Sequence, residues 1–291
     1  MIKNDLIIDV GMHRGEDTSY YLKKGYNVIA IDADPKTIKY VNQKFSREVK
    51  LKKLKILNYA IADIDDLQMD FNISELSLWS SLKKEIADRN HFAKETVKVE
   101  CKTLKTIFKR YGIPYYCKID IEGYDELCLQ TLVGSDILPT FISVESECVG
   151  ENEVLTDEQA LGTLNRLKEL GYSKFKLVDQ TSLEVLKKGE DFYSHAKMLK
   201  FRKPSLKTKI INKISKVLGI GTYTASHREL LNKKFNHNFF IGSSGPFGND
   251  LDGEWLNYDS AKACLLKHRK DYFKLQDSVN YGFWCDWHAT K

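Results

Sequence analysis

The sequence has 291 residues, of which 42% are hydrophobic and 29% are charged, and its formal net charge is +5. This length fits one large α/β domain with an appended segment. The charge is small and evenly balanced, which argues against a protein that binds nucleic acid along a basic surface. The chain has neither an apolar run of membrane-spanning length nor a signal-peptide pattern, so we expect a cytoplasmic protein without a transmembrane segment.

The cysteines point to a reduced environment. The six of them are Cys101, Cys117, Cys128, Cys148, Cys264 and Cys285. No two are spaced as CxxC, so the sequence predicts neither a zinc site nor a disulfide framework.

The first part of the chain alternates between short apolar strands and helices. Leu6–Asp9 and Val28–Asp32 are predicted strands, with a helix from Glu16 to Lys24 between them. A second helix is expected after Pro35, because proline fits the first turn of a helix. A third strand should end near Asn58, and residues 70–91 should form a loop and a short helix.

The alternation continues to about residue 200. Strands are predicted within 97–104, 115–123 and 138–147, and helices within 103–112, 124–134 and 157–172. Residues 174–180 and 195–201 are expected to form a closing strand pair. Strands that alternate with helices predict a doubly wound, mostly parallel Rossmann-like sheet, which we assign to a domain of residues 1–200.

Residues 201–291 are predicted to be a C-terminal extension packed on that domain. Residues 200–218 contain many basic residues and no acidic one, so this stretch can contact anionic lipid or the diphosphate of an activated sugar. The segment GSSGPFGND, from Gly242 to Asp250, is expected to be a flexible turn. The closing aromatic residues, Tyr281, Phe283, Trp284 and Trp287, are expected to anchor the tail, with a platform for a sugar ring as the alternative.

The stretch from Leu6 to Pro35 has the outline of a nucleotide-binding βαβ unit, but its loop lacks glycines. Counted from Gly11, the second and third glycine positions of a dinucleotide fingerprint hold His13 and Glu16. Acidic side chains at this helix start would repel a pyrophosphate. Asp32 is placed to accept hydrogen bonds from both ribose hydroxyls. An adenosine with a cationic group and no phosphate is S-adenosylmethionine.

Several motifs of residues 6–147, taken in order, resemble those of the FkbM-type, S-adenosylmethionine-dependent methyltransferases. They are DVGMHRGEDT, IDADP, NYAIAD, WSSL, VECKTLKTIF, CKIDIEGYDELCLQTL and FISVESE, of which KIDIEG is the most specific. The resemblance implies methylation of oxygen atoms, commonly on sugars of surface glycans or of secondary metabolites. Lys105, Tyr124 and Asp125 depart from the family's pattern, at positions that concern the substrate more than the cofactor.

The motifs and the resemblance together predict the residues that contact the cofactor. These are Asp9, Gly11, Met12, His13, Gly15, Asp17, Thr18, Asp32, Ala33, Ala60, Ser81 and Asp120.

The candidate catalytic residues follow two predicted strands, at the edge of the sheet where ligands bind. They are Lys118, Asp120, Glu122 and Glu145, with Glu147 beside them and His13 in the first loop. A carboxylate can act as the base for a hydroxyl, with Lys118 orienting it, or the carboxylates can hold a Mg²⁺ ion. The alternative for Lys118 is a structural ion pair with Glu122. His195, His237 and His288 are expected to be structural or solvent-facing.

We therefore expect an O-methyltransferase that acts on a sugar hydroxyl of a nucleotide-activated sugar, a glycan or a metabolite. A nicotinamide-dependent sugar oxidoreductase and a non-catalytic cofactor-binding scaffold are the alternatives, and N-methylation stays open. The expected partners are small molecules rather than nucleic acid. The sequence leaves the oligomeric state open.

Overall fold

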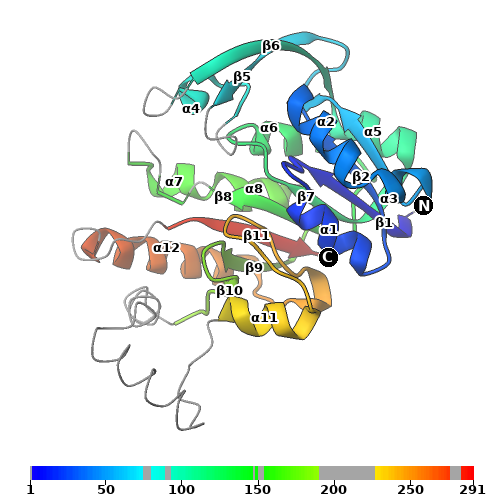
Figure 1. The fold of residues 1–291 in the computed structure, drawn as a ribbon. Coiled ribbons are helices and arrows are strands. Elements are labelled where there is room, and N and C mark those ends of the chain that lie inside the picture. Colours follow the sequence, from blue (N-terminus) through cyan, green and yellow to red (C-terminus); the bar gives the residue numbers. More distant parts are fainter. Residues whose placement is uncertain are drawn as a thin grey trace, which may run out of the picture.

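The structure, a computed structural model, describes residues 2–74, 80–88, 93–146, 148–149, 154–189, 227–275 and 283–291 (Figure 1). Its first half holds the strands β1 (Ile2–Val10), β2 (Asn27–Asp32), β3 (Leu54–Asn58), β4 (Ala60–Ile61), β5 (Gln68–Ser74), β6 (Ala93–Lys102) and β7 (Ile113–Ile119). The helices among them are α1 (Glu16–Lys23), α2 (Pro35–Lys44), α3 (Ser46–Lys50), α4 (Lys84–Ala87) and α5 (Leu104–Tyr111).

The second half contains α6 (Asp125–Gln130), β8 (Phe141–Ser146), α7 (Asp157–Ala160), α8 (Gly162–Glu169), β9 (Lys174–Asp179) and β10 (Glu184–Val185). After residue 226 follow α11 (His227–Phe235), the 3-10 helix η3 (Gly248–Asp250), α12 (Tyr258–Leu275) and β11 (Cys285–Thr290). None of the helices in the described ranges is both long and apolar enough to cross a bilayer.

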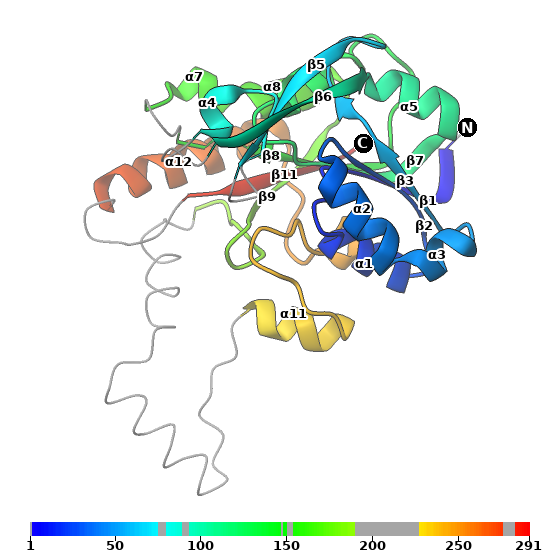
Figure 2. The same cartoon turned by 45° about the horizontal axis from the view of Figure 1, so that its top comes forward.

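The main sheet has the strand order β10-β9-β11-β8-β7-β1-β2-β3 within the described residues. The strands from β8 to β3 are parallel to one another, and β11 is antiparallel to both of its neighbours, β8 and β9. The expected mostly parallel Rossmann-like sheet is confirmed. A smaller sheet, β4-β6-β5, lies beside it and is seen most clearly in Figure 2.

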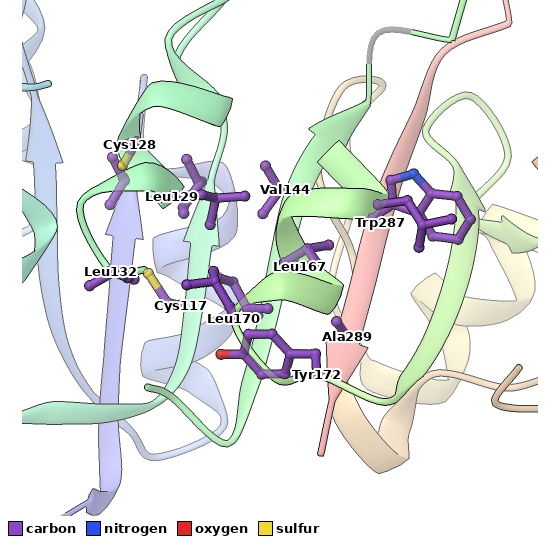
Figure 3. Close-up of a cluster of buried hydrophobic side chains, with 14 of the residues drawn as sticks. Cys117, Cys128, Leu129, Leu132, Val144, Leu167, Leu170, Tyr172, Trp287 and Ala289 are labelled. Atoms are coloured by element: carbon purple, nitrogen blue, oxygen red, sulfur yellow. The ribbon is translucent and has the colours of Figure 1, made fainter. Parts of the chain in front are cut away.

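Alternate strand residues pack on opposite faces of the sheet, as the twofold repeat of a strand requires. Leu6, Ile8 and Val10 of β1 belong to a core that α5, α6, α8 and α12 cover. Figure 3 shows part of this core, in which Cys117 and Val144 of the sheet lie near Leu129 of α6. On the other face, Ile7 belongs to a core formed with α1, α2 and α11.

The C-terminal end of the chain lies inside the sheet instead of on its surface. In Figure 1, β11 runs between β8 and β9, and Trp287 is completely buried. Residues 174–179 form β9, which pairs with β10 and β11, whereas residues 195–201, the other half of the expected closing pair, lie outside the described part. Phe283 and Trp287 are buried in the core, as the expected anchor requires, Trp284 lines a pocket, and Tyr281 lies outside the described residues.

Three local predictions were wrong. Residues 70–74, expected to belong to a loop, form part of β5, because β6 supplies an antiparallel partner for a strand with weak alternation of its own. The helix predicted within 157–172 is divided at Leu161 into α7 and α8. The segment Gly242–Asp250 is not an exposed turn, since Ser244 is buried and Phe247 stacks on Tyr116 with ring centroids 4.0 Å apart. The basic stretch 200–218 lies outside the described residues.

The position of Trp287 predicts a large effect of its removal on stability. We expect Trp287→Ala to lower the free energy of unfolding by about 3–5 kcal/mol, because a fully buried aromatic side chain leaves a cavity. Phe240→Ala, at a residue that is 54% exposed, should change it by less than about 0.5 kcal/mol. Denaturant melts of both variants test this, and similar losses would contradict the position of β11 in the sheet.

Candidate active site

A pocket lies outside the carboxyl ends of β1, β2 and β7, where the strand order switches direction on either side of β1. Val10 and Gly11 line it from β1, Asp32 from β2 and Asp120 from the end of β7. This is the position at which open α/β sheets bind their ligands.

Gly11 allows the ends of β1 and β7 to approach each other closely. Its φ is +77°, and a Cβ atom added there would lie 1.7 Å from the carbonyl oxygen of Asp120. The glycine that looked like a cofactor-binding residue is therefore required first of all by the contact between two strand ends.

Asp32 is held in a defined orientation at the mouth of the pocket. Its carboxylate accepts hydrogen bonds of 2.9 Å from the backbone N–H groups of both His13 and Asp34. Burial raises the pKa of Asp32 to about 6. The side chain of His13 lines the pocket and approaches Glu16, with 3.5 Å between Nδ1 and Oε2.

One end of the pocket is mostly apolar. It is lined by Ala33, Tyr59, Ala60, Ile61, Phe71 and Leu82. Of these, sequence reasoning found only the two alanines, because Phe71 comes from a strand that was predicted as a loop. Neither lysine nor arginine is among the described residues that line the pocket, so it offers no charge from either residue type to neutralise a phosphate.

Lys118 lies beneath the pocket as a buried cation. It is 3% exposed, and its Nζ donates a hydrogen bond of 3.0 Å to the carbonyl oxygen of Gly11. The same nitrogen lies 3.6 Å from Asp9, 3.8 Å from Asp17 and 3.4 Å from Asp120. The alternative predicted for Lys118 was a structural ion pair with Glu122. Lys118 does form structural ion pairs, but its partners are the three aspartates and not Glu122.

Burial and the neighbouring charges together set the pKa values in this cluster. Burial alone would lower the pKa of Lys118, but Asp120, Asp9 and Asp17 keep it well above its usual value. Burial also raises the pKa of Asp17 to about 7. Asp286 of β11 is affected in the same way, with burial and Asp120 raising its pKa to about 7. The cluster therefore holds more acid than one lysine can neutralise.

Three carboxylates converge at the open side of the pocket. Asp120, Glu122 and Glu145 each contribute an oxygen atom, and these atoms lie within 4.8 Å of one another. Burial and the neighbouring Glu122 and Asp120 raise the pKa of Glu145 well above its usual value. Trp284 donates a hydrogen bond of 2.5 Å from Nε1 to Glu145 and also lines the pocket. Glu147 lies outside the described residues.

The loop that carries Glu122 is held by its neighbours. Glu122 has a φ of 52°, which is uncommon for a residue other than glycine. The carboxylate of Asp125 accepts hydrogen bonds of 3.0 Å from the N–H groups of Ile121 and Gly123 on either side. Ser81 donates a further bond of 2.7 Å to the carbonyl oxygen of Glu122. Asp125 is thus a positioning residue, although its difference from the family's pattern had suggested a role in substrate choice.

The structure divides the predicted site residues into two groups. Those that line the pocket are Gly11, His13, Asp32, Ala33, Ala60, Asp120 and Glu122. Those that support it from below or behind are Asp9, Met12, Gly15, Asp17, Thr18, Ser81 and Lys118, all of them buried. Glu145 lies at the edge, against a second cavity.

His237 and His288 are not among the residues that line the pocket. His237 packs its ring against Tyr20. His288 is buried in β11, where burial lowers its pKa to about 3. His195 lies outside the described residues.

The model of the methyltransferase FkbM domain family matches residues 9–174 of this chain. The chain belongs to the FkbM methyltransferase family. The match contains the pocket-lining residues of β1, β2 and β7 and all three converging carboxylates, whereas Gly242 and Trp284 come from beyond it. No curated protein matches the sequence.

Three of the solved structures that are similar to this chain have the following names and scores. One is the precorrin-6y C5,15-methyltransferase of Geobacter metallireducens GS-15, with 9% identity, a TM-score of 0.33, and coverage of 62% of this chain and 72% of that one. Another is a SAM-dependent methyltransferase of Aquifex aeolicus, with 11% identity, a TM-score of 0.31, and coverage of 61% and 77%. Phosphoethanolamine N-methyltransferase 2 of Haemonchus contortus has 10% identity, a TM-score of 0.35, and coverage of 100% and 49%.

The raised pKa of Asp17 predicts how stability depends on pH. Because the folded protein binds this proton more tightly than the unfolded chain, the stability it provides is complete below about pH 4 and is lost as the pH rises through about 7. Between about pH 4 and pH 7, the free energy of unfolding of the wild type should fall by on the order of a few kcal/mol more than that of Asp17→Asn. The variant should show the smaller fall because it lacks the carboxyl group that titrates. Denaturant melts across the range test this, with the exposed Asp136→Asn as control. Parallel curves for all three proteins would contradict it.

Proposed function

We propose that the chain is an S-adenosylmethionine-dependent O-methyltransferase that acts on a sugar hydroxyl. One observation carries the proposal: a pocket lined by Asp32 and by apolar side chains also contains Asp120 and Glu122, which converge with Glu145. The family match supports methyl transfer, and the chemistry of the lining supports the choice of cofactor and acceptor.

The lining of the pocket fits S-adenosylmethionine. Asp32 would hold the ribose hydroxyls, and the apolar residues around Ala60 and Phe71 would surround the adenine. Asp120 and Glu122 give the other end a negative charge that suits a positive sulfur. When bound, this cofactor would supply an electrophilic methyl carbon: the acceptor oxygen would bond to that carbon as its bond to sulfur breaks, sulfur would leave as a neutral thioether, and the hydroxyl proton would pass to a base.

The carboxylates would accept the proton of the hydroxyl. Glu145 is the best candidate base, since its raised pKa makes its carboxylate more basic than an exposed one. Trp284 would hold Glu145 in place through its Nε1 hydrogen bond. Lys118 would act through Asp120 and the backbone of Gly11, as a positioning residue without contact to substrate.

Two alternatives depend on the same carboxylates. The oxygen atoms of Asp120, Glu122 and Glu145 are close enough together to hold a Mg²⁺ ion, which would bind substrate oxygens. The second alternative is an amine acceptor, which would need less help from a base than a hydroxyl does. We favour the direct base mechanism on a hydroxyl because Glu145 already has a protein hydrogen-bond donor on one oxygen.

Cofactor binding is tested by Asp32→Asn. We expect the variant to bind S-adenosylmethionine about tenfold to a hundredfold more weakly in calorimetry, because hydrogen bonds to a charged group are lost. Asp70→Asn, on the exposed surface, should bind like the wild type. A wild-type protein that is stabilised against heat by NAD and not by S-adenosylmethionine would instead support an oxidoreductase.

The base is tested by Glu145→Gln. We expect turnover with a sugar acceptor to fall by about a hundredfold or more while S-adenosylmethionine affinity stays unchanged, because the variant keeps the shape and loses the proton acceptor. Unchanged turnover would exclude Glu145 as the base, and loss of turnover after EDTA treatment, with recovery on adding Mg²⁺, would favour the metal alternative.

A further inference from the structure

A second cavity of about 300 Å³ lies on the far side of the carboxylates from the cofactor pocket. It lies among α6, α7, α8 and the carboxyl end of β8, elements that Figure 1 shows next to one another. The lining residues that matter here are Lys83, Glu126, Gln130, Glu145, Gln159 and Thr163. Its size is within the range of small-molecule sites.

The two cavities share a wall, which is the loop from Asp120 to Glu126. Asp120, Glu122 and Tyr124 line the cofactor pocket, whereas Asp125 and Glu126 line the second cavity. Glu145 belongs to the second cavity and has an oxygen atom within 4.8 Å of one on Glu122 and one on Asp120. The converging carboxylates therefore lie at the boundary between the two cavities, where a donor and an acceptor would meet.

The second cavity offers neutral polar groups to a ligand. The side chains of Gln130 and Thr163 form no hydrogen bond with any other described residue, although both line the cavity. Gln159 uses its Oε1 to accept a bond from the N–H of Thr156, which leaves its NH₂ group for a ligand. Amides and a hydroxyl provide both donors and acceptors, as the hydroxyl groups of a sugar require.

The charge of the second cavity is unfavourable for a phosphate. Asp125, Glu126 and Glu145 line it, against the single cation of Lys83 among the described lining residues. Glu126 lies 3.6 Å from Arg166, and Lys83 lies over the ring of Tyr124 at 5.9 Å. The balance stays acidic, and carboxylates repel the like charge of a diphosphate.

We propose that the second cavity binds the acceptor, and that the acceptor unit held there is a sugar without phosphate groups, with Gln130, Gln159 and Thr163 binding its hydroxyls. This inference rests on the proposed function. It adds to that function the place where the acceptor binds and the class of sugar that binds there. Of the sugar acceptors considered from the sequence, it selects a glycan or metabolite sugar over a nucleotide-activated one.

The test uses the full-length protein with S-adenosylhomocysteine, methyl glycosides of common hexoses as probes, and UDP-glucose as the phosphate-bearing comparison. In saturation-transfer NMR, we expect signals from a methyl glycoside and none from the sugar protons of UDP-glucose. Gln130→Leu/Thr163→Val should weaken glycoside binding about tenfold or more, because two hydrogen-bonding groups are lost. Thr163→Trp, which fills the cavity, should abolish it. Gln43→Leu, on the exposed face of α2, is the control.

Calorimetry with S-adenosylhomocysteine on the same samples separates the two proposals. If no protein binds it, the proposed function fails. If all bind it equally, three results overturn the present inference: glycoside signals unchanged in both cavity variants, no glycoside signal in the wild type, or stronger signals from the sugar of UDP-glucose. Thermal melts show whether each variant is folded.

Discussion

The buried ammonium of Lys118 is the interaction on which the rest of the site depends. It joins the end of β1, the first turn of α1 and the end of β7 through Asp9, Asp17 and Asp120, and it binds the carbonyl oxygen of Gly11. A buried charge is tolerated only where its partners surround it, so none of these elements can move alone. The pocket therefore takes its shape from an ion cluster in which Asp120 belongs to the lining, whereas Lys118, Asp9 and Asp17 do not.

The C-terminal strand links completion of the fold to completion of the site. β11 fills the gap between β8 and β9, and Trp284 just before it reaches both the cofactor pocket and Glu145. Asp286 on the same strand approaches the Lys118 cluster, and Ser244 donates its backbone N–H to Asp17. Residues outside the family match thus contact both the candidate base and the first turn of α1.

Charge gives the two cavities a common selectivity. The cofactor pocket contains acids and, among the described residues, neither lysine nor arginine, while acids outnumber the one cation in the second cavity. This field favours a cationic donor and an uncharged acceptor, and it opposes polyanions in both places. Burial, together with the neighbouring Glu122 and Asp120, raises the pKa of Glu145, which is the property that the proposed base for a hydroxyl would need.

The sequence by itself determined the sheet class, the acid at the end of β2 and the acids after β7 and β8, because strand periodicity and strand ends are local features of the chain. It also predicted that the first loop disfavours a pyrophosphate, since the missing glycines and the acids at the start of α1 are visible in the residue types. Only the tertiary structure decided that Lys118 is buried among aspartates rather than paired with Glu122, and that the closing strand is Cys285–Thr290. It likewise decided that Phe71 and Trp284 line the pocket. These facts depend on which distant segments meet, and burial, which sets both packing and pKa, exists only after they have met.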